Sequence, residues 1–282
     1  MSIDHCTWRR RTFLKTAGIL TTLGMADSRE LLANDMKSIT LVLDHKDKVA
    51  TSGPCRWATT ELEQALGEQH IHVARADTLA SAPAGDLCVL IASVASSAAS
   101  SILRSAGIDA PVGPEAIAVV SGVKHSGKPL ILATGTDARG VMYAVLELTD
   151  RVRCSDFAFP ALTAAGTVVE APANKLRSIN RCFQSDLEDT PWFEDKDMWS
   201  AYLTMLATHR FNMFNLSMGL GYDYPQKVFD SYTYFTYPFF VKVPGYEQIH
   251  AGKLTDEQRE KNLDILRFVS ATCAQRGIDF TL

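Results

Sequence analysis

The sequence lacks three features that would each indicate a class of protein. It has no apolar run near the roughly 20 residues that a membrane-spanning helix needs. It has no excess of positive charge, because 28 lysines and arginines are set against 32 aspartates and glutamates. We therefore expect neither nucleic acid nor an anionic membrane as its partner. Its six cysteines form no CxxC pair and no metal-ligand spacing, so we expect no metal site. We also expect no cofactor.

What the chain does contain is enough apolar material for a folded core. Its 282 residues are 46% hydrophobic and carry a formal net charge of -4, spread along the sequence. This length and composition suit one large or two medium domains. A small neutral or acidic ligand is compatible with such a chain.

The first residues have the composition of an export signal. The stretch RRRTFLKTAG begins at Arg9 and leads into ILTTLGMA, a short apolar run with a small-residue cleavage site near Ala26. It resembles a twin-arginine signal, and the matching residues are Arg10, Arg11, Phe13, Leu14 and Lys15. A membrane anchor or an ordinary amphipathic start is the alternative. We expect residues 1–33 to be a signal peptide and the protein to be exported, periplasmic or extracellular.

Residues 37–153 alternate between apolar runs and amphipathic stretches, which is typical of an α/β domain. Asp137 stands where it can cap the last helix. The stretch GVKHSGKP fits a phosphate-binding loop, but Pro129 replaces the required serine or threonine and a strand follows, so we expect a hairpin. The expected strands are 38–44, 71–76, 87–94, 115–122 and 129–135, and the expected helices are 56–69, 97–107 and 136–152.

Residues 154–175 interrupt this rhythm with prolines, small residues and a short β-like stretch, TVVEAP, and we expect a linker there. Strands are then expected at 176–183, at 211–218 and from 278 onward. An acidic loop to Asp195 precedes a helix that ends at His209, and a second helix starts at the capping box Thr255 to Gln258. For the first helix the apolar spacing predicts an inner face made of Met198, Tyr202, Met205 and Leu206.

Strand, helix, strand, helix, strand is the repeating unit of a (β/α)8 barrel, also called a TIM barrel. A complete barrel takes about 250 residues, far more than residues 176–282 supply. The expected fold class is therefore α/β: a small α/β sandwich domain followed by the first part of a TIM (β/α)8 barrel, with the chain truncated inside that barrel.

Two stretches resemble known glycoside hydrolases. GPEAIAV (113–119) and GTDARGVMYAVLELTDRV (135–152) are similar to the α/β domain that precedes the barrel of family 20 hexosaminidases and family 67 α-glucuronidases. Those families share a GPE strand and a G-x-x-x-R-G-x-x-Y-A/G helix, matched here by Gly135, Arg139, Gly140, Tyr143 and Ala144. Gly140 would let this helix pack closely on the sheet.

The barrel part carries the same resemblance. In those families an arginine opens the first strand and a K/R-x-N motif precedes the second, positions that Arg177, Arg210 and Asn212 occupy. Ser217 stands where family 20 enzymes have a sugar-facing histidine. The resemblance implies that the catalytic acids follow the fourth strand or a later one, beyond residue 282, so that the catalytic residues of this chain are unknown.

Barrel enzymes bind substrate at the carboxyl ends of their strands. On the first strand Arg177 and Arg181 could grip sugar hydroxyls or a uronate carboxylate, or could equally be buried and paired with a barrel carboxylate. Asn215 could contact substrate or satisfy backbone groups, whereas Asn212 fits a structural role better. The acidic loop could hold a catalytic carboxylate at Asp186, Glu188 or Asp189, or could be a solvated loop whose later members, Asp195 and Asp197, cap a helix.

Residues 222–246 hold ten of the chain's twenty-five aromatic residues. Aromatic faces suit sugar rings, although such a cluster can also pin a long loop to the fold. Tyr222, Asp223 and Tyr224 are nearest the strand end, and we expect them to touch substrate.

These observations predict an exported glycoside hydrolase-like protein that acts on poly- or oligosaccharides. Hydrolysis of glycosidic bonds normally requires a pair of carboxyl groups. Since the resemblance places those groups beyond this sequence, we expect the chain alone to be inactive. The alternative is a non-catalytic carbohydrate-binding or scaffold protein.

Overall fold

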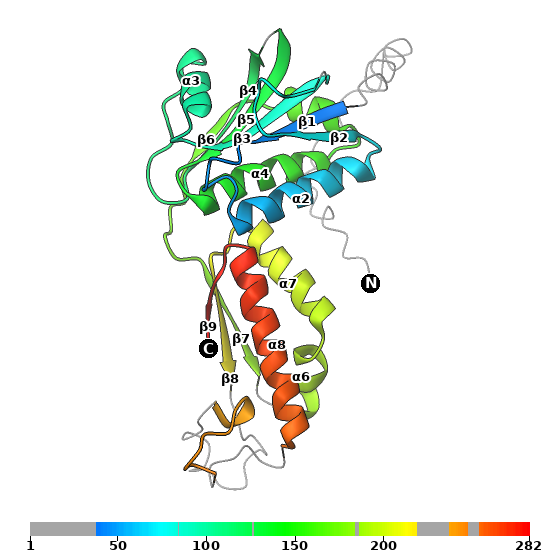
Figure 1. The fold of residues 1–282 in the computed structure, drawn as a ribbon, viewed down its shortest axis with the longest axis vertical. Coiled ribbons are helices and arrows are strands. Elements are labelled where there is room, and N and C mark those ends of the chain that lie inside the picture. Colours follow the sequence, from blue (N-terminus) through cyan, green and yellow to red (C-terminus); the bar gives the residue numbers. More distant parts are fainter. Residues whose placement is uncertain (1–37, 84, 126, 184–185, 219–236, 248–253) are drawn as a thin grey trace, which may run out of the picture. The chain divides into compact units, whose positions relative to one another are not determined.

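The computed structural model describes residues 38–83, 85–125, 127–183, 186–218, 237–247 and 254–282. The chain divides into two compact units, unit 1 (Met1–Pro172) and unit 2 (Ala173–Leu282) (Figure 1). Among the described helices none is long and apolar enough to cross a membrane.

Unit 1 is built on a six-stranded mixed sheet in the order β2-β1-β3-β5-β4-β6. β1, β2, β3 and β5 run parallel, while β4 pairs antiparallel with both β5 and β6. The two strands β4 and β5 form the hairpin predicted from Pro129. The strands are β1 (Ser38–Leu43), β2 (His72–Ala76), β3 (Leu87–Ser93), β4 (Ile117–His125), β5 (Lys128–Gly135) and β6 (Val168–Glu170).

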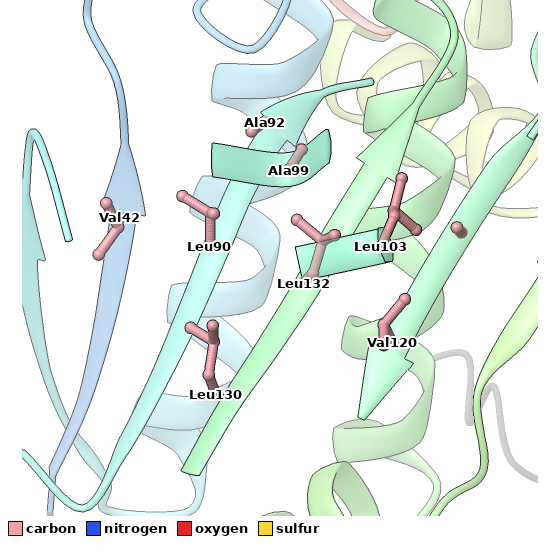
Figure 2. Packing of buried hydrophobic residues seen from close by; sticks show 9 residues of the cluster. Val42, Leu90, Ala92, Ala99, Leu103, Val120, Leu130 and Leu132 are labelled. Atoms are coloured by element: carbon pink, nitrogen blue, oxygen red, sulfur yellow. The ribbon is translucent and has the colours of Figure 1, made fainter. Parts of the chain in front are cut away.

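Helices cover both faces of this sheet. α3 (Ser97–Ser105) lies on one face, where Ala99 and Leu103 meet a cluster that includes Val42, Leu90 and Leu132 (Figure 2). α2 (Gly53–Glu68) and α4 (Ala138–Arg153) pack against each other on the opposite face. The strand residues alternate between the two faces, and most are fully buried, as expected for a parallel sheet covered on both sides.

Residues 154–175, expected as a linker, contain folded parts of unit 1. α5 (Ala158–Thr163) packs on α4, and β6 adds an edge strand to the sheet through its pairing with β4. The β-like stretch TVVEAP contains this strand. What the local pattern does not reveal is its pairing with the open edge of β4, which lies far away in the sequence.

Unit 2 contains a three-stranded parallel sheet in the order β7-β8-β9. β7 (Ser178–Phe183), β8 (Met213–Met218) and β9 (Asp279–Thr281) are joined by α7 (Lys196–Thr208) and α8 (Asp256–Gln275). Consecutive parallel neighbours joined by helices form the start of a (β/α) barrel. The predicted fold class, an α/β domain followed by part of a barrel, is thus confirmed.

Capping residues set the helix starts of unit 2. Asp195 accepts a hydrogen bond from the N–H of Met198 at the start of α7. At the start of α8, Thr255 and Gln258 form the complete capping box. Both caps satisfy backbone N–H groups that have no partner inside the helix.

Two expectations for unit 2 were wrong. The acidic stretch before α7 contains a helix, α6 (Asp186–Phe193), in place of the expected loop. The buried face of α7 is formed by Trp199, Leu203, Leu206 and Ala207, while Met198, Tyr202 and Met205 are only partly buried. The helix is rotated toward Trp199, whose large ring fills the space between α6 and β8.

Candidate functional site

The three strands of unit 2 have two chemically different faces. On the outer face, Phe214 packs edge-to-face on Trp199 and Tyr202 of α7, with ring centroids 5.8 Å apart in both pairs. Helices α7 and α8 lie along this side (Figure 1). Because successive strand residues point to opposite faces, Asn215 and its alternate neighbours face the other way. This inner face corresponds to the interior of a barrel.

The inner face carries a hydrogen-bonded row of polar side chains, which we call the inner-face ladder: Asn180, Asn215, Ser217 and Thr281. Asn215 donates from Nδ2 to Asn180 Oδ1 at 3.1 Å and to Ser217 Oγ at 3.2 Å. Ser217 donates to Asn180 Oδ1 at 2.9 Å, and Thr281 donates to Asn215 Oδ1 at 3.0 Å. The ladder therefore ties β7, β8 and β9 together through side chains as well as backbone.

The ladder extends to the carboxyl ends of the strands. Asn180, Asn215 and Thr281 lie opposite one another in the sheet register, and the next row, Cys182 opposite Ser217, is one step nearer the carboxyl ends. Asn180 and Cys182 are exposed. Barrel interiors are usually filled with bulky branched residues, so a polar row here is typical of a binding surface.

Arg181, predicted as a substrate-binding residue, lies on the outer face. Its guanidinium carbon is 4.0 Å from the centroid of the Trp192 ring and 5.3 Å from that of Tyr202. Burial raises the pKa of Tyr202, and the positive charge of Arg181 opposes that rise. The guanidinium thus stacks between α6 and α7 on the opposite side of β7 from Asn180.

Arg177, the other predicted arginine, lies before the amino end of β7. It donates from Nε to the carbonyl of Arg210 and from Nη1 to the carbonyl of Asn174 at 2.8 Å. Asn212 completes this arrangement, because its Oδ1 accepts from the N–H of Arg177 and its Nδ2 donates to the carbonyl of Lys175. The arginine and the K/R-x-N motif therefore join the amino ends of β7 and β8, away from the carboxyl ends.

Asn212 is buried and bonded to backbone, which confirms its predicted structural role. Arg210, two residues earlier, adopts a positive φ of 62° as the chain leaves α7. Of the predicted site residues, Asn215 is the one that the structure places on the inner face. Tyr222, Asp223 and Tyr224 lie outside the described residues.

Three acidic residues of the 184–197 stretch, Asp189, Glu194 and Asp195, have structural partners. Asp189 accepts a hydrogen bond from the indole N–H of Trp192 at 2.8 Å, and Glu194 pairs with Lys261 at 2.6 Å. Asp195 caps α7, with Asp197 in its first turn. The interpretation of Asp195 as a helix-capping residue is confirmed, and Asp197 stands in the first turn, where a negative charge opposes the helix dipole.

Two rings in the described part of the aromatic stretch belong to the hydrophobic core of unit 2. Phe239 and Phe240 are buried, and Phe239 lies 5.2 Å from the ring of Phe183. Two side chains of α8 hold this short 3-10 turn, η1 (Tyr237–Phe239): Arg259 donates to the carbonyl of Pro238 and Asn262 to that of Phe239. For these rings the loop-pinning alternative is confirmed.

In unit 1 the GPE motif and the helix motif form one joint. Arg139 pairs with Glu115 at 3.3 Å, and Asp137 accepts from the N–H groups of both Glu115 and Gly140. A Cβ on Gly140 would lie 2.6 Å from the carbonyl oxygen of Ala116, which confirms that this glycine allows close packing. Glu115 adopts a positive φ of 59°, a strained conformation that these contacts hold.

The cysteines and acidic residues offer no metal centre in the described part of the chain. No group of three histidines, cysteines, aspartates or glutamates is placed to hold an ion there. The five described cysteines are free thiols. Burial raises the pKa of Cys55 and of Cys88 to about 11 and that of Cys273 to about 12, so these thiols stay protonated.

Sequence reasoning missed two members of the ladder, Asn180 and Thr281, and noted Ser217 only as the residue in place of a sugar-facing histidine. The signal that could have found them is alternation, because polar residues at 180 and 182 and at 215 and 217 are separated by residues that face the helices. Arg181 was predicted as a site residue because of its charge. It directly follows Asn180 in the strand, so its side chain points to the opposite face.

No protein-family model and no curated protein sequence matches the chain. The structure is similar to that of a GH138 enzyme targeting pectin rhamnogalacturonan II, with a TM-score of 0.59 and 20% sequence identity over 85% of this chain. The match covers 24% of that enzyme, so the chain spans about a quarter of its length.

Two more distant structures also belong to glycoside hydrolase families. BtGH115A, a GH115 4-O-methyl-α-glucuronidase with specificity for decorated arabinogalactans, has a TM-score of 0.47 and 15% identity over 64% of this chain and 25% of its own. CpGH84B has a TM-score of 0.45 and 12% identity over 86% of this chain and 33% of its own. The chain thus has a glycoside hydrolase-like fold, and the match to the GH138 enzyme carries this conclusion.

Proposed function

We propose that this chain is part of a glycoside hydrolase-like protein that acts on poly- or oligosaccharides. The observation that carries the proposal is the inner-face ladder, a row of neutral hydrogen-bonding groups at the carboxyl ends of barrel strands. Hydroxyl-rich ligands need donors and acceptors of this kind. The glycoside hydrolase-like fold supports the same function, and the pectin target of the GH138 enzyme suggests the first substrate to test.

The described strands do not bring together the two carboxyl groups that hydrolysis requires. Glycosidases place these groups about 5–9 Å apart around the bond to be cleaved. On the described inner face the one acidic residue is Asp279, which lies opposite Met213 in the register row below Asn215. The proposal therefore assigns the catalytic carboxyl groups to other barrel strands and predicts that residues 1–282 alone bind glycans without cleaving them.

The second candidate is a non-catalytic carbohydrate-binding or scaffold protein. The neutral character of the ladder favours it, because binding hydroxyl groups needs no acid or base. Sequencing the coding DNA beyond codon 282 separates the two candidates. Further strand and helix units with paired acidic residues at the strand ends would favour the hydrolase, and their absence would favour the binding protein.

The experiment that tests the shared part of both proposals is a binding and cleavage assay. The purified chain is mixed with pectin, rhamnogalacturonan II and glucuronoxylan, binding is followed by affinity electrophoresis, and cleavage is followed by the release of reducing ends. We expect retardation by at least one polysaccharide and no release. Release of reducing ends would overturn the assignment of the acids to other strands, and no retardation by any glycan would overturn the carbohydrate role.

A further inference from the structure

We propose, resting on the proposed function, that the inner-face ladder recognises the uncharged hydroxyl groups of a glycan and that Asn180 is the residue that donates to them. Two properties of unit 2 indicate which part of a sugar this surface selects: the hydrogen bonds that the ladder residues already make, and the positions of Arg177 and Arg181.

The hydrogen bonds of the ladder leave Asn180 with a free donor. Its Oδ1 accepts from both Asn215 and Ser217, which uses both lone pairs of that oxygen. Its Nδ2 makes one long contact, 3.4 Å to the sulfur of Cys182. An amide nitrogen has two N–H groups, and the second has no acceptor among the described residues. Since Asn180 is exposed, this N–H is available to a ligand.

Asn215 acts on the ligand through Asn180. Its Nδ2 donates one hydrogen bond to Asn180 and one to Ser217, and its Oδ1 accepts from Thr281. Because Asn215 Nδ2 can only donate, it forces Asn180 to turn its oxygen toward β8. The Nδ2 of Asn180 is then directed toward the carboxyl end of β7. Asn215 is therefore a positioning residue, and Asn180 is the one that contacts the ligand.

Among the described residues of the three strands, the inner face offers no cation to hold a uronate carboxylate. None of the inner-face residues of β7, β8 and β9 is a lysine, arginine or histidine. Arg181 points to the opposite face and stacks on Trp192, and Arg177 is spent on carbonyl groups beyond the amino end of β7. A carboxylate placed on the ladder would lose its hydration without gaining a cation. A hydroxyl group loses much less hydration free energy, and hydrogen bonds to the ladder offset that loss.

The test compares ligands that differ in charge but share their hydroxyl pattern. Trigalacturonic acid and its methyl ester are titrated into the 15N-labelled chain, together with the neutral galactotriose and xylotriose, and the side-chain amide signals of Asn180 and Asn215 are followed by NMR. We expect a neutral ligand to shift the Asn180 signals and trigalacturonic acid to bind at least threefold more weakly than its ester. Tighter binding of the acid, or binding that leaves the Asn180 signals unmoved, would overturn this inference while the carbohydrate role stands.

A matched pair of variants isolates the donor. Asn180→Asp keeps an oxygen that can accept from Asn215 and Ser217 but replaces the donating nitrogen with a negatively charged acceptor oxygen. If the ligand accepts from Asn180, we expect affinity for the neutral ligand to fall roughly threefold to tenfold, the worth of one hydrogen bond. Ser178→Ala changes an exposed residue of the same face near the amino end of β7 and should leave affinity unchanged. Equal affinity of Asn180→Asp and the unaltered chain would refute the role of Asn180. Binding of none of the four glycans would overturn the proposed function itself.

Discussion

The guanidinium of Arg181 lies over the ring of Trp192, with 4.0 Å between its central carbon and the ring centroid. We expected Arg181 in the substrate site, but its side chain connects β7 to α6, the helix that follows. The inner face of the same strand is left to the neutral Asn180. Arg181 should therefore matter for stability rather than for ligand binding.

Replacing Arg181 with methionine tests this assignment. Arg181→Met keeps a long apolar side chain but loses the cation over the ring, an interaction worth about 0.5–2 kcal/mol. We expect the free energy of unfolding, measured by urea titration, to fall by that amount while glycan affinity stays unchanged. Arg104→Met on the exposed side of α3 is the control and should change neither quantity. Loss of glycan binding at unchanged stability would return Arg181 to the substrate site.

Gly140→Ala tests the joint between α4 and the sheet. The added Cβ would lie 2.6 Å from the carbonyl oxygen of Ala116, a backbone atom that cannot move aside easily. We expect the free energy of unfolding to fall by about 1–3 kcal/mol, as for other overpacked sites. Gly67→Ala is the matched control, because a Cβ there meets nothing within 4 Å and alanine is the better helix former. Equal effects of the two substitutions would show that the close approach does not exist in solution.

Asp47 should make the stability of unit 1 depend on pH. Burial raises the pKa of Asp47, but hydrogen bonds from the N–H groups of Ser93, Ala50 and Val49 together outweigh it and lower the pKa below its ordinary value. A lowered pKa in the folded state means that Asp47 stabilises the fold above the pKa of an unfolded aspartate, about 4. That contribution is lost as the pH falls through the lower folded-state value.

Asp47→Asn removes this contribution. We expect the variant to melt at a lower temperature than the unaltered chain at pH 7 and the gap to narrow as the pH falls below about 4. Asp44→Asn is the control, because it changes a neighbouring carboxylate that accepts one local hydrogen bond, from Lys46. Its melting temperature should stay close to that of the unaltered chain at every pH. A gap that widened toward acid pH would contradict the lowered pKa.

Export is a prediction about residues 1–33, which lie outside the described part of the chain. We propose that Arg10 and Arg11 direct this segment to twin-arginine export. Fused to a fluorescent reporter that folds before transport, residues 1–33 should carry it to the periplasm of a bacterium, as measured by cell fractionation. Exchange of both arginines for lysine should retain the reporter in the cytoplasm, whereas Arg9→Lys should not. Equal export of both variants would contradict the assignment.

The order of elements could be predicted well because it depends on local patterns. Apolar runs predicted β1, β3 and β5, and Asp137, Asp195 and Thr255 marked helix starts. These signals act within a few residues of the chain. α6 was missed because an acidic segment with Pro191 has little helical signal of its own. The pairing of β6 was missed because its partner β4 lies far away in the sequence.

The candidate site was predicted less well than the fold. Sequence reasoning placed the site at the strand ends and included Asn215, but it chose Arg177 and Arg181 by their charge. Their side chains are held by groups far along the chain, the carbonyl of Arg210 and the ring of Trp192. No local pattern reports such partners.

By itself the sequence determined most of the secondary structure of each unit, the caps at Asp137, Asp195 and Thr255, and the glycine contact that joins α4 to the sheet. Strand alternation also dictated that Asn180 and Arg181 point in opposite directions. Only the tertiary structure decided which of the two faces the helices. That choice was made by packing, because the rings of Phe214, Trp199 and Trp192 bury one face of the strands and leave the polar ladder on the other.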